Sequence, residues 1–263
     1  MARRQQNAFL VGRVAVRVII VDGPPGSDAA FTPRDIARIG AINQRALTIL
    51  SRLAAAQPPR IPLVWAPNTS VVPVPVPPFP PAVVTSLDPV QVEAREAPWR
   101  DAALTTLVGQ SGAAGLAALR AASIGGADHC IIIFWTRYEC SHPAYATDAL
   151  ARLVMCHPMI ARERLGQGLQ DAPRHLAHEI CHLFGAVDEY IGPGSCDVLN
   201  THPTQGGPVG FGELDFPNFN CARTNPAPVA CLMLDSIELI CPSTVAHIGW
   251  ADSNGDGVLD VFQ

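Results

Sequence analysis

The sequence predicts an α/β fold of the α+β type, in which a twisted mixed sheet with two long helices precedes an irregular C-terminal region. Three observations predict it. Strand-like and helix-like apolar segments alternate in the first part of the chain. Residues 130–136 (CIIIFWT) are almost entirely apolar, as in a buried central strand. Residues 186–250 are rich in Gly, Pro and Asn and show little periodicity.

The first elements have clear boundaries. Residues 14–21 (VAVRVIIV) predict a strand, because they are β-branched and end before a Gly-Pro turn. Thr32 and Pro33 form a favourable N-cap and N1 pair, so a helix is predicted over 34–56, where apolar residues recur at helical spacing. A second short strand is predicted at 61–65 (IPLVW).

The middle of the chain is proline-rich. Because proline lacks an N–H and fixes φ, residues 66–98 are predicted to be extended and irregular, lying over the domain as a connection. An Ala/Leu-rich helix is predicted over 99–122, and a short strand over 151–156. Asp171 and Pro173 introduce a predicted helix over 172–185, which ends at a glycine.

The composition excludes several classes of function. The chain has 263 residues, a net charge of -5 and no lysine among its 18 basic residues. Lysine Schiff-base chemistry and the P-loop are therefore excluded. The acidic balance argues against nucleic acid as a partner, and no stretch approaches the roughly 20 apolar residues that cross a bilayer.

The cysteines and the N-terminus leave the compartment open. Cys196, Cys221, Cys231 and Cys241 fall in the loop-rich C-terminal region, where disulfides stabilise most, which favours a secreted or extracytoplasmic protein. The N-terminal apolar run is interrupted by arginines and lacks a cleavage site before the first turn, so we interpret it as a strand rather than a signal peptide.

A metal-binding pattern lies in the last predicted helix, at residues 178–190 (HEICHLFGAVDEY). His178 and His182 are four residues apart, so both face the same side of a helix and can bind one ion. Glu179 is placed to take a proton from a metal-activated water and pass it to a leaving group. Gly185 allows a sharp turn, after which Asp188 can return to the metal as a third ligand.

This spacing resembles the metzincin signature H-E-x-x-H-x-x-G-x-x-H, with Asp188 in place of the third histidine. Aspartate at that position is similar to snapalysin-like members, and the Asp-Glu-Tyr ending is similar to IgA-peptidase-like metallopeptidases. Zinc also accepts carboxylate oxygen, although Glu189 remains an alternative third ligand. The resemblance implies a zinc endopeptidase and a methionine-containing turn, for which Met233 is the candidate.

We therefore predict a monomeric zinc-dependent peptidase that acts on a protein or peptide substrate. The alternative from another class is a non-catalytic, zinc-stabilised binding or adhesion module, which needs the ion but not Glu179. A zinc hydrolase acting on a non-peptide amide is a third hypothesis. The predicted domains are an N-terminal catalytic subdomain over 1–186, with the zinc helix, and a loop-rich C-terminal subdomain over 187–263.

Several residues near the motif have simpler interpretations. His175 shares the face of His178 but is predicted to lie at the rim, and Cys181 points away from the metal face. Tyr190 is interpreted as structural rather than as an oxyanion donor. Glu189 is expected to hold the ligand loop through a hydrogen bond or salt bridge. His157 is expected to be an ordinary loop histidine.

The C-terminus carries a candidate calcium loop, residues 252–260 (DSNGDGVLD). Its spacing places oxygen ligands as in an EF-hand-type loop, with the glycine at the sixth position, and resembles dockerin or thrombospondin-type loops. Gln263 stands where the bidentate glutamate is expected, so weak Ca²⁺ binding is predicted. The alternative is a simple polar turn. The candidate ligands are Asp252, Asn254, Asp256, Val258 through its carbonyl, and Asp260.

Overall fold

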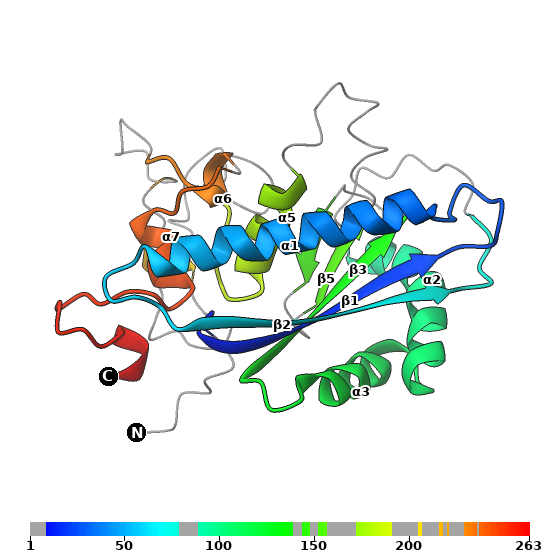
Figure 1. Cartoon of the computed structure of the whole chain (residues 1–263), viewed down its shortest axis with the longest axis horizontal. Helices are drawn as coiled ribbons and strands as arrows, with labels where there is room; N and C mark the ends of the chain where they lie inside the picture. The colour runs from blue at the N-terminus through cyan, green and yellow to red at the C-terminus, as the bar shows by residue number, and fades with distance from the viewer. Residues whose placement is uncertain are drawn as a thin grey trace.

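The computed structural model describes residues 9–78, 89–138, 144–147, 152–156, 172–190, 205–206, 216–217, 220, 229–235 and 237–263. A five-stranded sheet lies at its centre, in the order β2-β1-β3-β5-β4 (Figure 1). Its strands are β1 (Gly12–Asp22), β2 (Leu63–Pro73), β3 (His129–Thr136), β4 (Ala144–Thr147) and β5 (Arg152–Cys156). Neighbouring strands are parallel except β4, which is antiparallel to β5, so the sheet is mixed.

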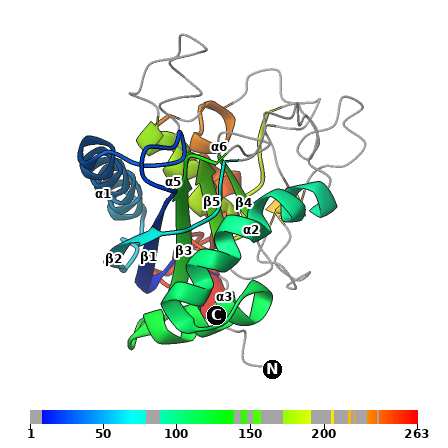
Figure 2. The same cartoon turned by 90° about the vertical axis from the view of Figure 1, so that its right-hand side faces the viewer.

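Helices cover both faces of this sheet. They are α1 (Pro33–Ala55), α2 (Pro89–Val108), α3 (Gly112–Ile124), α5 (Ala172–His182), α6 (Leu232–Asp235) and α7 (Pro242–His247). Figure 2 shows α1 and α5 on one face, with α2 and α3 on the other. A two-stranded ladder of β6 (Gln205–Gly206) and β7 (Phe216–Pro217) and a 3-10 turn (Asp260–Phe262) complete the described elements. The predicted mixed α/β class is confirmed.

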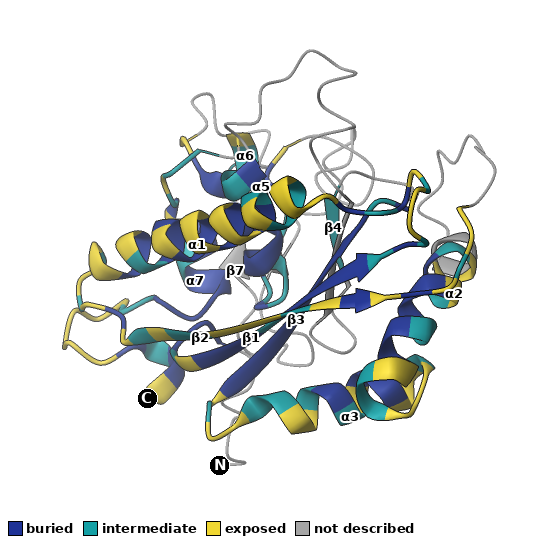
Figure 3. Cartoon of the chain, turned by 45° about the vertical axis from the view of Figure 1, so that its right-hand side comes forward, coloured by how far each residue is buried: buried dark blue, intermediate teal, exposed yellow. Residues whose placement is uncertain are grey.

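The N-terminus of α1 is a capping box, as the Thr32-Pro33 pair predicts. The Thr32 hydroxyl accepts a hydrogen bond from the Asp35 amide at 3.2 Å, and the Asp35 carboxylate accepts one from the Thr32 amide at 3.0 Å. The helix then packs its apolar side, including Ile39 and Leu50, into the core beside α5. Its outer side is exposed (Figure 3).

The alternation of side chains along β1 divides the core into two layers. Val16 and Val18 pack in the cluster that contains α1 and α5, whereas Ile19 and Val21 pack in the cluster that contains α2 and α3. The central strand β3 contributes to both clusters and is buried at every position (Figure 3). The prediction of a buried central strand at 130–136 is confirmed.

The prediction that residues 66–98 are irregular is wrong at both ends. Strand β2 continues to Pro73, and α2 begins at Pro89. Val74 donates its amide to the Asp22 carbonyl at 2.8 Å, and alternate residues of a strand point the same way. Pro67 and Pro73 therefore direct their missing N–H groups to the open edge of the sheet, where a strand tolerates proline.

The single helix predicted over 99–122 is also wrong, because two helices meet at a break. Gly109 and Gly112 adopt φ values of +70° and +57°, which the α-helix does not allow. Pro98 lies within α2, and the adjacent Trp99 is fully buried against Phe134 and Tyr138. This packing offsets the hydrogen bond that proline removes from the helix.

The short strand β4 was not predicted from the sequence. The other boundaries differ by a few residues: β2 begins at Leu63 and α5 ends at His182. Among the described residues, no single helix meets the length and hydropathy of a membrane span, whereas the bent pair Glu93–Val108 and Gly112–Ile124 meets them jointly. The subdomain boundary at 186/187 stays a prediction.

A buried histidine at the start of β3 predicts acid sensitivity. His129 is 2% exposed and lies edge-on to Phe184, with ring centroids 5.6 Å apart. Burial lowers the pKa of His129 below 6.5, against the opposing charge of Asp128, while the charge of Arg120 lowers it further. The neutral ring therefore contributes stability above pH 6.5, and this contribution is lost as the pH falls toward the folded-state pKa.

We expect His129→Leu to remove this dependence. Between pH 7 and pH 5, the wild-type free energy of unfolding should fall relative to that of the variant, by up to about 1.4 kcal/mol per pH unit. Urea unfolding of both proteins at a series of pH values measures the difference. A pH-independent difference would contradict the prediction, since packing losses alone do not vary with pH.

Candidate metal centre

Helix α5 places its two motif histidines on a different side from the residues that pack in the core. Leu176 and Ile180 are fully buried in the core cluster, and Cys181 is buried with them as a free thiol. His178 and His182 lie one turn apart on the other side, with ring centroids 4.7 Å apart. Their spacing in the helix brings the two Nε2 atoms within 3.1 Å of each other.

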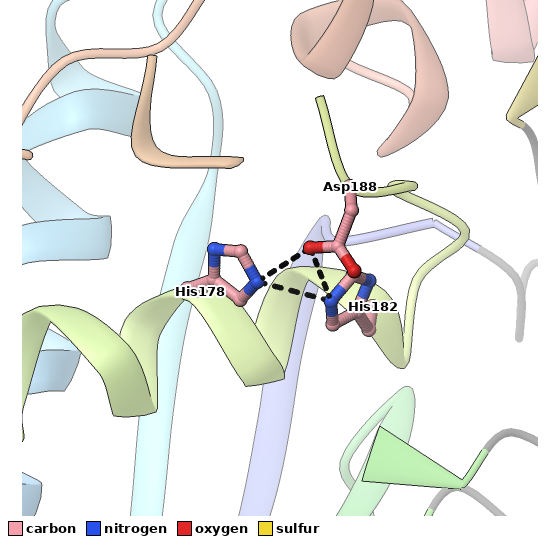
Figure 4. A group of neighbouring side chains, drawn as sticks. All are labelled: His178, His182 and Asp188. Atoms are coloured by element: carbon pink, nitrogen blue, oxygen red, sulfur yellow. Dashed lines mark hydrogen bonds and ion pairs between the residues drawn. The ribbon is translucent and has the colours of Figure 1, made fainter. Parts of the chain in front are cut away.

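The chain after α5 brings a carboxylate to these rings. Gly185 adopts a φ of +94°, which favours glycine and reverses the chain. Asp188 then places its Oδ1 2.9 Å from the His178 Nε2 and 3.3 Å from the His182 Nε2 (Figure 4). The three side chains, which the sequence places together, form a group that could hold a metal ion.

Backbone carbonyls orient both imidazoles. The His178 Nδ1 lies 2.9 Å from the Leu232 carbonyl oxygen, and the His182 Nδ1 lies 2.8 Å from the Ala186 carbonyl oxygen. A carbonyl only accepts hydrogen bonds, so each Nδ1 donates its proton and each Nε2 is left to face Asp188 or a bound cation. Two imidazole Nε2 atoms and a carboxylate oxygen therefore converge, and a cation held between them, whether a proton or a metal ion, would stabilise this arrangement.

The donor set and its spacing fit zinc. Bonds of about 2.0–2.1 Å in a tetrahedron separate neighbouring ligand atoms by about 3.3 Å. The separations of 2.9, 3.1 and 3.3 Å are within a few tenths of an ångström of that value. Two imidazoles and one carboxylate would also leave a fourth position open on a bound zinc ion, as catalytic zinc sites require.

Without a bound metal ion, a proton on His182 balances the negative charge of the Asp188 carboxylate. Burial acts to lower the pKa of His182, but the hydrogen bond to Asp188 and the charge of Glu179 raise it to about 9. Burial likewise acts to raise the pKa of Asp188, but the hydrogen bonds from His178 and His182 bring it below its usual range. The group therefore favours a bound positive charge, whether that charge is a proton or a metal ion.

Glu179 lies next to this group and is protected from solvent. The residue is 9% exposed, and its carboxylate accepts a hydrogen bond from the Ala146 amide of β4. Burial raises the pKa of Glu179, and the nearby His182 and His178 act in the opposite direction. A carboxylate with a raised pKa is a stronger base than an exposed one, which suits the acceptance of a proton.

Asp188, rather than Glu189, reaches the histidines in the structure. Glu189 is 1% exposed and directs its Oε1 to the Thr244 hydroxyl at 2.7 Å. Its amide also donates to the Met233 carbonyl at 3.1 Å, so it holds the ligand loop by hydrogen bonds. The Tyr190 hydroxyl donates to the Asp188 Oδ2 at 3.0 Å, which orients the carboxylate.

The candidate Met-turn lies beside the metal helix. Met233 is fully buried within α6, and the preceding carbonyl, that of Leu232, is the one that orients His178. His175 is not among the side chains of this group. His157, Cys196 and Cys221 lie outside the described residues.

The sequence does not reveal the backbone groups of the site. Ala146 supplies an amide to Glu179, and Leu232 and Ala186 supply carbonyls to the two histidines. Every residue carries these groups, so no residue type marks their role. Only the path of the chain reveals them.

The C-terminal loop is closed by its own hydrogen bonds. The Asp252 carboxylate accepts the amides of Gly255 and Gly257, each at 2.9 Å. The Gln263 side-chain amide donates to the Val258 carbonyl at 2.9 Å and to the Asp256 carboxylate at 3.3 Å. Calcium binding by Asp252, Asn254, Asp256, Val258 and Asp260 stays a prediction, because these contacts account for the loop without an ion.

Comparison with known proteins assigns no family. No family model matches the chain, and no curated protein matches it either. A solved structure, the zinc-dependent peptidase from Methanocorpusculum labreanum (strain Z), is 16% identical over 66% of this chain and 82% of that chain, with a TM-score of 0.36. This similarity is too low to assign an activity.

Proposed function

We propose that this chain is a zinc-dependent endopeptidase. The observation that carries the proposal is the convergence of two imidazole Nε2 atoms and one carboxylate oxygen within 2.9–3.3 Å, beside a buried carboxyl group. His178, His182 and Asp188 would hold the ion. Bound there, zinc supplies Lewis acidity that activates water and polarises a carbonyl.

Glu179 would act as the general base and then the general acid. Its buried carboxylate would take a proton from the attacking water and deliver it to the leaving amine. The Ala146 amide restrains one side of this carboxylate, so that its position toward the metal group is maintained. Tyr190 would keep Asp188 oriented and would remain a donor, because burial and the adjacent carboxylate raise its pKa.

The edge strand β4 supports binding of an extended peptide. It lies at the end of the sheet, antiparallel to β5, and contacts α5. A peptide chain pairing with this edge would place its backbone near Glu179 by main-chain hydrogen bonds. The Tyr145 hydroxyl donates to the buried Glu96 carboxylate, which also accepts from Arg100 at 3.2 Å, so β4 is tied to α2.

We expect Tyr145→Phe to weaken substrate binding more than turnover. Loss of the hydroxyl leaves Glu96 with one donor fewer and should lower the free energy of unfolding by about 1–3 kcal/mol. The Michaelis constant should rise several-fold, because β4 loses its tether, while kcat changes little. Tyr138→Phe is the control: Tyr138 donates to Val76 away from the metal group, so its loss should reduce stability but leave the Michaelis constant unchanged.

Digestion of a peptide library tests the function directly. Zinc-loaded protein should cleave peptides at internal bonds, detected by mass spectrometry, and chelator-treated protein should not. Readdition of zinc should restore cleavage. Zinc binding without cleavage of peptides would support a zinc-stabilised binding module instead, and cleavage confined to non-peptide amides would support a different zinc hydrolase.

A further inference from the structure

A second group of metal-ligating side chains lies in the core, apart from the histidine group. Glu189, Cys231 and Cys241 bring a carboxylate oxygen and two sulfur atoms within 4.8 Å of one another. Their relative exposures are 1%, 0% and 2%. They come from three separate segments, which are the loop after α5, the residue before α6 and the residue before α7.

The possible ligand atoms of this group lie within contact distance of one another. The Glu189 Oε1 lies 2.9 Å from the Cys241 Sγ and 2.7 Å from the Thr244 Oγ1, and the Asn220 amide donates to the Glu189 Oε2. The Thr244 Oγ1 also lies 3.2 Å from the Cys231 Sγ. Within the described part of the chain Glu189 forms no ion pair, and the described groups that contact its buried carboxylate are a thiol, a hydroxyl and an amide.

Backbone amides point at both sulfur atoms. The Cys241 amide donates to the Cys231 Sγ at 3.3 Å, and the Thr244 amide donates to the Cys241 Sγ at 3.4 Å. Hydrogen bonds to sulfur favour the thiolate, which is the form that binds metals. The Cys241 Sγ also donates to the Glu189 Oε1, so loss of the two thiol protons beside this carboxylate would need a cation for charge balance.

We propose that Glu189, Cys231 and Cys241 form a second, structural zinc site, with the Thr244 hydroxyl at the fourth corner. Two thiolates and a carboxylate are ligands that zinc accepts, and a closed four-ligand set is typical of structural sites. Binding releases the two thiol protons to solvent. A tetrahedral site separates sulfur from oxygen by roughly 3.5 Å, so the Cys241 to Glu189 contact lengthens as its thiol proton leaves.

This site would support the histidine group. Glu189 follows Asp188 directly, and Cys231 precedes Leu232, whose carbonyl orients His178. An ion held between Glu189 and Cys231 thus joins the third-ligand loop to the turn that positions the first ligand. Outer contacts of this kind change metal affinity by about 10–100-fold, and we expect a loss of this size at the histidine group when the second site is removed.

Cobalt binding to the metal-free, reduced full-length protein tests the proposal. Two equivalents of Co²⁺ should bind, and one should produce the near-ultraviolet charge-transfer band of a thiolate-cobalt bond. Cys231→Ser and Cys241→Ser should each lose that band and one equivalent. His182→Ala should keep the band, because this substitution affects only the histidine group. Cys130→Ser, which replaces a buried thiol on β3, should keep both the band and the stoichiometry.

A measurement on the wild type tests the proposal even if the variants fail to fold. Zinc should protect Cys231 and Cys241 from alkylation, as read by peptide mass spectrometry, while chelation should expose them to the reagent on unfolding or local opening. Binding of a single equivalent without the charge-transfer band would overturn the proposal. So would a Cys231–Cys241 disulfide in protein that was purified without reductant and binds only one zinc ion. Neither readout depends on peptide cleavage, so the second site and the peptidase function fail separately.

Discussion

Glu179→Gln is expected to abolish peptide cleavage while leaving the zinc content equal to that of the wild type. The substitution keeps the size of the side chain and an oxygen that can accept the Ala146 amide, but it removes the basic group. General acid–base groups contribute about 10²–10⁴-fold to a rate, so kcat should fall by at least this range. Zinc analysis and peptide digestion on the same preparation measure both quantities.

The comparison with its control makes this result specific. Glu238→Gln, on a surface carboxylate that pairs with Arg45, Arg52 and Arg174, should leave both cleavage and zinc content unchanged. If Glu179→Gln cleaves peptides at the wild-type rate, Glu179 is not the base. If neither the wild type nor Glu179→Gln cleaves any peptide while both bind zinc, the non-catalytic module becomes the better hypothesis.

Asp188→Ala is expected to remove zinc from the histidine group. Two imidazoles remain, but the charged oxygen that lies 2.9 Å from the His178 Nε2 is lost. We expect the dissociation constant for zinc at this group to rise at least about 100-fold, the upper end of the effect of losing an outer contact. Cleavage should disappear in parallel. Competition with a chelator of known affinity measures the constant.

The same variant should also lose stabilisation by zinc. An ion that binds only the folded state stabilises it by about 4 kcal/mol when its concentration is 1,000 times the dissociation constant. The wild-type melting temperature should therefore rise with added zinc, and that of Asp188→Ala should rise less. Asp28→Ala, on an exposed loop, is the matched control and should behave as the wild type does. Equal zinc affinity in Asp188→Ala and wild type would exclude Asp188 as a ligand.

Local patterns in the sequence were sufficient for several elements. The Thr32-Pro33 pair marks the start of α1, and the apolar run at 130–136 marks the central strand, because both signals are carried by adjacent residues. They were insufficient for β2 and α2. In both elements the prolines predict a break in regular structure. The open edge of the sheet accommodates them in β2, and the burial of Trp99 does so in α2.

The sequence by itself determined that His178 and His182 share one side of a helix, with Glu179 beside them, since a spacing of four residues is a property of the helix alone. Only the tertiary structure shows which of Asp188 and Glu189 lies beside the imidazoles. These neighbours have similar chemistry, and the turn at Gly185 sends one to the imidazoles and the other into the core. Tertiary structure also brought Leu232 and Ala146 to the site, because their contributions are backbone groups that any residue possesses.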